Sequence, residues 1–372
     1  MPIPDATGCP ACVIELVHAA TISGAQDSAH LMSYNYTVRD PDGGFLVVST
    51  PMLHTAMLFD STGVFVRSIG NAGGGPGEYQ EIGPIVTHGD HRWFVDRVQQ
   101  RISVLDADYG LAQEHKLPLR PWDLFVVDDS TFLVSANTMT PAQIGIPFHL
   151  VRSNGEIIRS FGESGRAVVA PVDRYRVRSL GDGTFLAIGE GGYEVERWSL
   201  DGHRLSAWDR TGGWFADGQE TAAARAAERP RLKPPVVRAL VSRGNHLWVL
   251  IIVPDPRWRE SRVEVRQASG AVTFRITDDN LEYDSIIEVL DLESGQVVAR
   301  TRIDTYLDGF VDDHHAYSFH TDSADIPSVN IWSVILRVPE SMSLDVSAKG
   351  TSVGARGYRS RSVAFDLPTG GV

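Results

Sequence analysis

Arginines and a few other polar side chains stand where successive short apolar runs of this chain begin. Arg174, Arg176 and Arg238 belong to two neighbouring runs of this kind. A guanidinium group carries five N–H donors in a planar fork that matches a carboxylate or a phosphate, so three of them could clamp an anion. They could equally pair with acids near them in the sequence, such as Asp173 or Asp255. The candidate ligand-binding residues are Tyr34, Asn35, Asp123, Arg174, Arg176 and Arg238.

A second set of oxygen-bearing side chains follows the ends of other apolar runs. Hard cations such as calcium prefer carboxylates and amide carbonyls, so calcium or another divalent cation is an open alternative, although no cofactor is certain. The competing interpretation is that these side chains hydrogen-bond to their own loops. The candidate metal ligands are Asp96, Asn137, Glu190 and Asp322, with His320 just before the last.

Motifs for other chemistry are weak or absent in the sequence. Gly73–Gly77 is rich in glycine, but neither a Lys-Ser/Thr pair nor a helix pattern follows it, which argues against a phosphate loop for nucleotides. The chain has no Gly-x-Ser-x-Gly elbow, and the spacing suggests no Ser/His/Asp set.

The only cysteines, Cys9 and Cys12, stand in a Cys-Pro-Ala-Cys sequence. Three interpretations remain open: a local disulfide, a free inert pair, or a lipid attachment at Cys9. The last arises because Ala6-Thr7-Gly8-Cys9 looks like the tail of a lipoprotein cleavage site. Zinc is disfavoured, since one CxxC supplies only two ligands and no second pair completes the set.

Composition limits the classes of partner. The 372 residues include 47 acids and 34 lysines and arginines, a net charge of −13, whereas nucleic-acid binding needs clustered basic residues. No apolar window approaches the roughly 18 residues that span a bilayer, and no charged segment followed by an apolar one opens the chain. We therefore expect no nucleic-acid partner, no transmembrane segment and no complete signal peptide. We expect a monomer outside the cytoplasm, in the periplasm or at the cell surface.

The elements that must position these residues repeat along the chain. The repeated unit is an apolar run, a tight turn and a second apolar run. Its first copy ends the first run in Leu58-Phe59-Asp60 and turns through Gly63, and its last copy lies at Val289–Gly295. A period of ~40–60 residues is typical of a radial β array. Five units divide into four strands each, and the sixth lacks its last strand, which the segment Val13–Ile22 can supply. The sequence therefore predicts an all-β, six-bladed β-propeller closed by its N-terminal strand joining the last blade. The expected boundaries are an extension over residues 1–11, the propeller over 12–338 and a tail over 339–372.

The repeat itself resembles a known family. Its pattern, Phe/Leu-x-Val-x-Asp followed by Ile-x-Val-x-Asp-x-x-Gly, is similar to that of NHL-type six-bladed β-propellers, and Gly70–Tyr79 looks like the glycine-rich exit from the outer strand in bacterial members. The resemblance covers roughly residues 12–338. It implies a fold and no single activity, because such propellers serve as lyases, lactonases and protein-binding scaffolds. Propeller hydrolases that resemble gluconolactonase or paraoxonase hold an axial calcium, which the metal set above would match.

The connections divide between the two faces of the predicted disc. Turns between the first and second strands of each unit, and between the third and fourth, are short. The remaining connections leave from the opposite face, which we call the looped face, and loops on a rigid scaffold commonly carry function. The long insertions there are Asn71–Gly83, Thr138–Pro147, Glu163–Arg174, Thr211–Pro235, Pro254–Asp284 and Thr321–Ser328.

Two of these insertions have recognisable patterns. Asp217–Arg229 is alanine-rich with late arginines and predicts a short helix, either a lid over the looped face or a passive flap. Pro254–Asp284 alternates apolar and polar residues around Ser269-Gly270 and predicts a β-hairpin, either a solvated arm or one that contacts a partner or an anion.

From these patterns we expect a non-catalytic binding scaffold that recognises a peptide, a protein or a small anion on the looped face. The alternative is a divalent-metal-dependent hydrolase or lyase, lactonase-like, with its site at the mouth of the central channel.

Overall fold

A computed structural model describes most of the chain. The described residues are 7–23, 31, 35–49, 53–137, 145–162, 174–189, 192–210, 215, 235–267 and 272–339. By its internal contacts the chain divides into a large unit, Met1–Arg337, and a short C-terminal one, Val338–Val372. The predicted helix over 217–229, most of the tail, and much of the insertions over 138–147, 163–174 and 211–235 lie outside the described residues.

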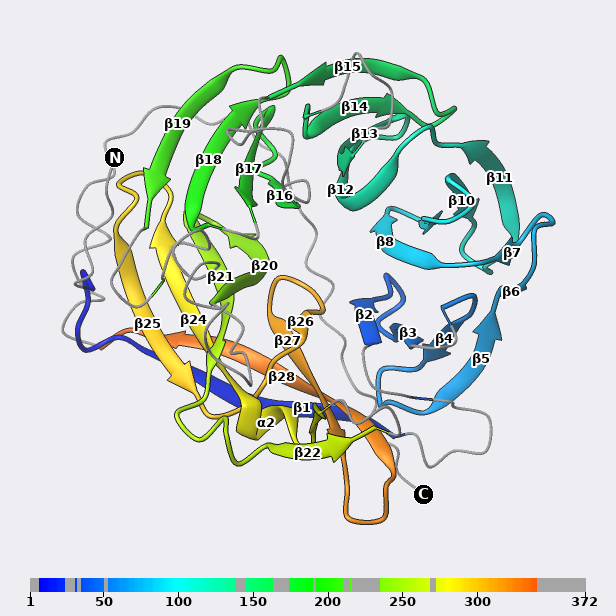
Figure 1. Cartoon of the computed structure of the whole chain (residues 1–372). Coiled ribbons are helices and arrows are strands. Elements are labelled where there is room, and N and C mark those ends of the chain that lie inside the picture. Colours follow the sequence, from blue (N-terminus) through cyan, green and yellow to red (C-terminus); the bar gives the residue numbers. More distant parts are fainter. Residues whose placement is uncertain are drawn as a thin grey trace, which may run out of the picture. The chain divides into compact units, whose positions relative to one another are not determined.

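Six four-stranded antiparallel sheets form the large unit and stand around a common centre (Figure 1). The fold is therefore an all-β, six-bladed β-propeller. Blade 1 consists of β2 (Asn35–Arg39), β3 (Phe45–Ser49), β4 (Ala56–Phe59) and β5 (Phe65–Ile69). Blade 2 consists of β8 (Ile82–His88), β9 (His91–Asp96), β10 (Arg101–Leu105) and β11 (Leu111–Lys116). Blade 3 consists of β12 (Arg120–Asp128), β13 (Thr131–Asn137), β14 (Phe148–Arg152) and β15 (Ile157–Phe161). Blade 4 consists of β16 (Tyr175–Ser179), β17 (Thr184–Gly189), β18 (Glu194–Ser199) and β19 (Arg204–Asp209). Blade 5 consists of β20 (Val236–Arg243), β21 (His246–Pro254), β24 (Tyr283–Asp291) and β25 (Val297–Ile303). Blade 6 consists of β26 (Gly309–Phe310), β27 (His315–Thr321), β28 (Pro327–Arg337) and β1 (Val13–Ser23).

The sixth blade joins the two ends of the ring. β1 pairs antiparallel with β28, from Val13 opposite Arg337 to Ser23 opposite Ser328. Ile14 and Ile22 of β1 are buried against the last blade and its neighbours. This pairing leaves no gap between the first and last blades, so the sheet edges that an open array would expose are covered.

The tight turns explain why the repeat is read so clearly in the sequence. In the turn between β4 and β5, Asp60 Oδ1 accepts hydrogen bonds from the backbone N–H of Thr62 at 2.8 Å and of Val64 at 3.0 Å. Gly63 there has φ of 86°, a left-handed conformation that glycine adopts without strain. Asp106 and Asp291 make equivalent bonds at the matching turns of blades 2 and 5.

The core lies between blades rather than within them. The second strands are the most buried, and every residue of β3 is enclosed. Apolar clusters join neighbouring blades, so that Val249 and Ile251 of blade 5 pack with Leu186 and Ile188 of blade 4. Each sheet therefore completes its hydrophobic burial only when the next blade is present.

Buried ion pairs also connect neighbouring blades. Arg92 of blade 2 donates to Asp40, which directly follows β2 of blade 1, at 2.9 Å. Both side chains are at most 2% exposed. Arg210, after β19, donates to Glu288 of β24 at 2.8 Å, with both side chains fully buried. Tyr193 donates its hydroxyl to the same carboxylate at 2.8 Å.

One strand is shorter than the sequence suggests. The inner strand of blade 6, β26, covers only Gly309–Phe310. Asp308 interrupts the ladder because its Oδ2 accepts the backbone N–H of Phe319 at 2.9 Å, in place of a strand-to-strand bond.

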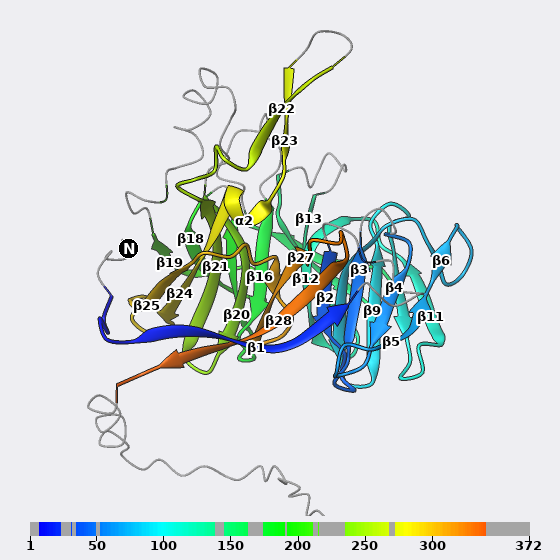
Figure 2. The ribbon, with the colours of Figure 1, turned by 90° about the horizontal axis from the view of Figure 1, so that it is seen from below.

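The insertion of blade 5 contains the expected hairpin, β22 (Arg262–Arg266) with β23 (Val272–Ile276), followed by the short helix α2 (Asp279–Glu282). Figure 2 shows this hairpin rising from one face of the disc. A further pair of two-residue strands, β6 (Asn71–Ala72) and β7 (Glu78–Tyr79), lies between blades 1 and 2.

Candidate functional site: an arginine cluster at the mouth of the central channel

A cavity of about 980 Å³ occupies the centre of the ring. Its walls are the inner strands β2, β8, β12, β16, β20 and β26, which surround the open centre of Figure 1. Each inner strand enters the disc from the looped face, because the tight turn at its other end leads to the second strand. The residues that begin the inner strands, and those that follow the second strands, therefore line the mouth of the channel.

Four arginines gather at that mouth, three of them around one tryptophan. The guanidinium of Arg174 lies 4.0 Å from the ring centroid of Trp122, that of Arg97 lies 4.6 Å away, and that of Arg120 lies 6.0 Å away. These distances fit cation–π contacts. The fourth arginine, Arg176, lines the same cavity from β16. We call Arg97, Arg120, Arg174 and Arg176, with Trp122 and Glu81, the arginine cluster.

The carboxylate of Glu81 lies beside two of these cations. Its Oε1 lies 3.0 Å from Arg97 Nη1, and its Oε2 lies 3.8 Å from Arg120 Nη2. Burial lowers the pKa of Arg97 below its ordinary value, Glu81 opposes that shift, and the positive charges of the other three arginines reinforce it. The cluster is thus a local concentration of positive charge on a chain of net charge −13.

Some buried donors of the cluster lack an acceptor among the described residues. Arg97 Nε and Trp122 Nε1 are buried and form no hydrogen bond within the described part of the chain. Buried donors without acceptors are rare in native structures, and each requires an explanation. An anionic oxygen that reached between the two side chains would supply the acceptor.

The other predicted ligand-binding residues on the channel already bind their neighbours. Asp123 Oδ2 accepts from the backbone N–H of Val177 and from Arg178 Nη1, both at 3.0 Å, which ties blade 3 to blade 4. Arg238 Nε donates to the backbone carbonyl of Asp308 at 2.8 Å, which ties blade 5 to blade 6. Asp123, Arg176 and Arg238 all line the cavity. Only Arg174 and Arg176 of the predicted set lie in the arginine cluster.

Tyr34 lies outside the described residues, as does the side chain of Asn35, the first residue of β2. The next residue, Tyr36, lines the cavity instead. Its hydroxyl donates to the carbonyl of Ile85 at 3.2 Å. Burial of this hydroxyl, and then the negative charge of Asp123, raise the pKa of Tyr36 to about 12.

Sequence reasoning missed Arg97, Arg120, Trp122 and Glu81. Two local signals could have found them. Arg97 directly follows the predicted metal ligand Asp96. The run Arg120-Pro121-Trp122-Asp123 opens an inner strand, and residues two apart on a strand, such as Arg120 and Trp122, face the same side of the sheet.

Two of the predicted metal ligands, Asp96 and Asp322, have described side chains, and each accepts hydrogen bonds from nearby donors. Asp96, fully buried at the end of β9, accepts four hydrogen bonds at 2.7–3.0 Å. One comes from Gln80, before β8, and three come from its own loop, from Val98 and twice from Gln99. Asp322 Oδ1 accepts two backbone N–H groups of the exposed turn before β28. His320 is exposed on β27. Glu190 and the side chain of Asn137 lie outside the described residues.

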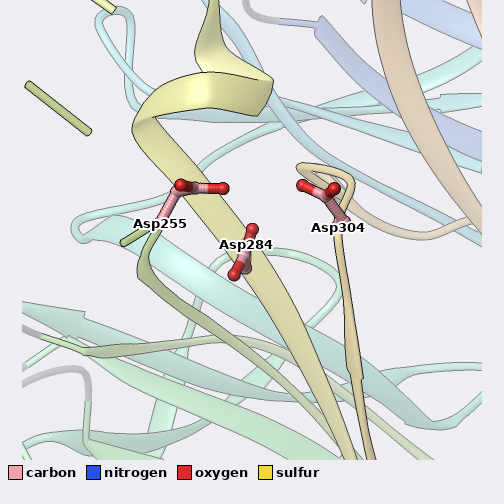
Figure 3. Close-up of side chains that lie close together, drawn as sticks. All are labelled: Asp255, Asp284 and Asp304. Atoms are coloured by element: carbon pink, nitrogen blue, oxygen red, sulfur yellow. The ribbon is translucent and has the colours of Figure 1, made fainter. Parts of the chain in front are cut away.

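A different trio of acids lies close together, at the base of the blade 5 insertion. Asp255, Asp284 and Asp304 bring carboxylate oxygens within 4.8 Å of one another (Figure 3). Two arginines occupy the positions that a cation would need. Arg257 Nη2 donates to Asp255 Oδ2 at 3.2 Å and to Asp304 Oδ1 at 3.0 Å, and Arg302 Nε donates to Asp284 Oδ2 at 2.5 Å.

The two buried members of this trio interact directly. Burial raises the pKa of Asp284, and the neighbouring Asp255 reinforces the rise. Burial acts in the same direction on Asp255, but hydrogen bonds from Arg257 outweigh it and lower its pKa. The trio is therefore best described as an acid network neutralised by two arginines.

Comparison with known proteins supports the fold. Residues 26–165 match a family model described as a 6-bladed beta-propeller, DUF5128. No curated protein matches the chain significantly. A candidate exported protein of Bacteroides fragilis superposes with a TM-score of 0.56 at 12% identity, over 91% of this chain and 98% of the other. A member of the DUF4221 family from Bacteroides vulgatus gives 0.58 at 10% identity, over 87% and 98%. At such identities the likeness concerns the fold alone, and the NHL type in particular stays a prediction.

Proposed function

We propose that the protein is a non-catalytic binding scaffold whose arginine cluster recognises a carboxylate or phosphate group of a peptide, a protein or a small ligand. The observation that carries the proposal is the convergence of three guanidinium groups on Trp122, with Arg176 on the wall of the same cavity and Glu81 beside two of the arginines. Guanidinium groups stay charged at all physiological pH values, so they recognise anions well and transfer protons poorly. The site is thus built for binding rather than for acid–base chemistry.

The position of the cluster supports the same function. It lies where the cavity opens to the looped face, so a ligand can reach it from solvent while part of the ligand enters the channel. Trp122 adds an apolar surface between charged groups, a combination common at recognition sites.

Charge reversal tests the proposal. We expect wild-type protein to bind inorganic phosphate or a hexaglutamate peptide in titration calorimetry, more weakly as salt rises. Arg120→Glu and Arg174→Glu should each weaken binding at least about tenfold, the loss expected for one hydrogen bond to a charged group. Arg159→Glu is the matched control, because Arg159 is similarly exposed but pairs with Asp201 on an outer strand. Equal affinity in all four proteins, or no binding to any probe, would reject this site.

Arg238 provides an internal comparison. Since Arg238 already pairs with Asp308, we expect Arg238→Gln to change anion affinity less than Arg174→Gln. A larger effect at Arg238 would move the site to the far wall of the channel.

We also propose that the protein works outside the cytoplasm. Cys9 and Cys12 form a disulfide, the first of the three interpretations left open by the sequence, and such bonds persist mainly in oxidising compartments. Maleimide–polyethylene glycol added to denatured protein taken directly from cells should shift its gel mobility only after reduction. A shift without reduction would contradict this location.

A further inference from the structure

The β22–β23 hairpin exposes more apolar surface than its surroundings. It stands away from the disc on the looped face (Figure 2). Five of its ten residues are large and apolar, and all are 36–46% exposed: Val263, Val265, Val272, Phe274 and Ile276. A two-stranded hairpin on its own is at best marginally stable in water. Such exposure on a projecting arm is typical of a surface that binds another chain.

The base of the arm is rigid. Glu282 is fully buried and binds Arg262 at the foot of β22 through two oxygens. Ser261 donates its hydroxyl to the same carboxylate at 2.5 Å, and Thr277 closes the base with a hydrogen bond from its backbone N–H to Ser261 at 2.8 Å. Arg262 also lies 4.7 Å from the ring centroid of Trp258. The arm is therefore held in place before any partner arrives, which reduces the entropic cost of binding.

The outer edge of β22 has no neighbouring strand among the described residues, since β22 and β23 form a sheet of two. An uncovered edge offers backbone N–H and C=O groups to a strand of another chain. The edge carries charges of both signs: Glu264 and Arg266 are 53% and 74% exposed and lie 3.4 Å apart. Val265 lies between them on the opposite face of the strand.

We propose that this edge pairs with β22 of a second copy of the chain, antiparallel and about a twofold axis at Val265. In that register Glu264 lies opposite Arg266 of the second copy, and Arg266 lies opposite its Glu264. Val265 meets Val265 of the second copy. Opposite charges across two strands stabilise a pair, whereas like charges destabilise it.

The charges also select this register over its neighbour. A twofold axis at Glu264 would place Glu264 against its own copy and Arg262 against Arg266, with two arginines opposed on each side. A twofold axis at Val263 would set Arg262 against Glu264, but the side chain of Arg262 is 9% exposed and is already bound to Glu282. The free charges of β22 are thus self-complementary about Val265, as an isologous interface requires. The resulting dimer differs from the monomer expected on composition.

Sedimentation of charge-reversed variants tests the pairing. Wild-type protein should pass from monomer to dimer over a concentration series from about 1 µM to about 1 mM. Glu264→Arg and Arg266→Glu each place like charges opposite one another at two symmetric positions, so each should raise the dissociation constant about tenfold or more. An equimolar mixture of the two variants restores both opposite-charge pairs and should form a heterodimer that neither variant forms alone. These side chains are exposed, so the variants should keep the wild-type fold.

The controls use an exposed ion pair elsewhere. Arg152 and Glu156 lie 2.6 Å apart at the tight turn of blade 3, with 53% and 55% exposure, and reversing either should leave dimerisation unchanged. A wild-type protein that stays monomeric throughout the series would overturn the proposal. So would a mixture of the two β22 variants that associates no better than each variant alone.

Discussion

Replacing Glu288 by Gln should destabilise the propeller strongly while leaving its shape intact. Glu288 of β24 and Arg210 after β19 are fully buried and join blades 4 and 5 at 2.8 Å. Arg300 lies 3.5 Å from the same carboxylate. The substitution removes the negative charge but keeps the volume, so the buried Arg210 guanidinium loses the carboxylate of Glu288.

The expected loss follows from that burial. Removing one partner of a buried ion pair costs about 3–5 kcal/mol. The unit Met1–Arg337 has an unfolding entropy of about 0.7 kcal/mol/K, at roughly 2.1 cal/mol/K per residue. We therefore expect the Tm to fall by about 4–7 °C in differential scanning calorimetry, and chemical unfolding to show the same loss of free energy.

An exposed pair of similar geometry gives the control. Arg197 and Asp182 lie 2.7 Å apart but are 31% and 50% exposed, so Asp182→Asn should cost at most about 1 kcal/mol. The double variant Arg210→Met/Glu288→Leu should lose less stability than Glu288→Gln, because it leaves no isolated charge. If Glu288→Gln costs no more than Asp182→Asn, the burial argument is wrong.

Three further predictions follow from the structure. Asp96→Ala should lower the free energy of unfolding by about 1–3 kcal/mol, because the variant leaves buried donors of the 97–99 loop unpaired. A chelator should leave the Tm of the wild type unchanged. A Tm that falls on addition of a chelator would indicate that Asp96 is a metal ligand. Ile22→Ala should lower the free energy of unfolding by about 2–5 kcal/mol, since Ile22 is fully buried in β1. Deletion of residues 1–23 should abolish cooperative unfolding in calorimetry. A cooperative transition in the deletion variant would show that the ring is stable without β1. For Asp284 the folded pKa is raised above the ordinary 3.8, so its contribution to stability is complete below that value and is lost as pH rises through the raised pKa. Melting curves from acid to neutral pH should therefore show the wild type losing stability relative to Asp284→Asn as pH rises, and parallel curves would show that the pKa of Asp284 is not raised.

The fold was largely predictable because its turns repeat. Asp60, Asp106 and Asp291 occupy the same position in three blades and make the same side-chain bonds to the backbone. Apolar runs of four to seven residues between such turns leave little choice except short antiparallel strands. The inner strand of blade 6 was the exception, because Asp308 uses its side chain where the pattern suggests backbone pairing.

The site was harder to predict because it joins three blades. The sequence pointed to Arg174 and Arg176, whose position at the start of an inner strand follows from the repeat. Arg97 follows a second strand, and only the packing of blade 2 against blade 3 brings it to Trp122. Spacing along the chain carries no information about that contact, and the same holds for the acid trio of blade 5.

The closing strand has a consequence for how the molecule is made. The partner of Val13 is Arg337, so β1 must wait for nearly the whole propeller to be synthesised before it can pair. Contacts between such distant parts of a chain form slowly. Until then, β1 is an unpaired β-segment that a chaperone of nascent chains can bind.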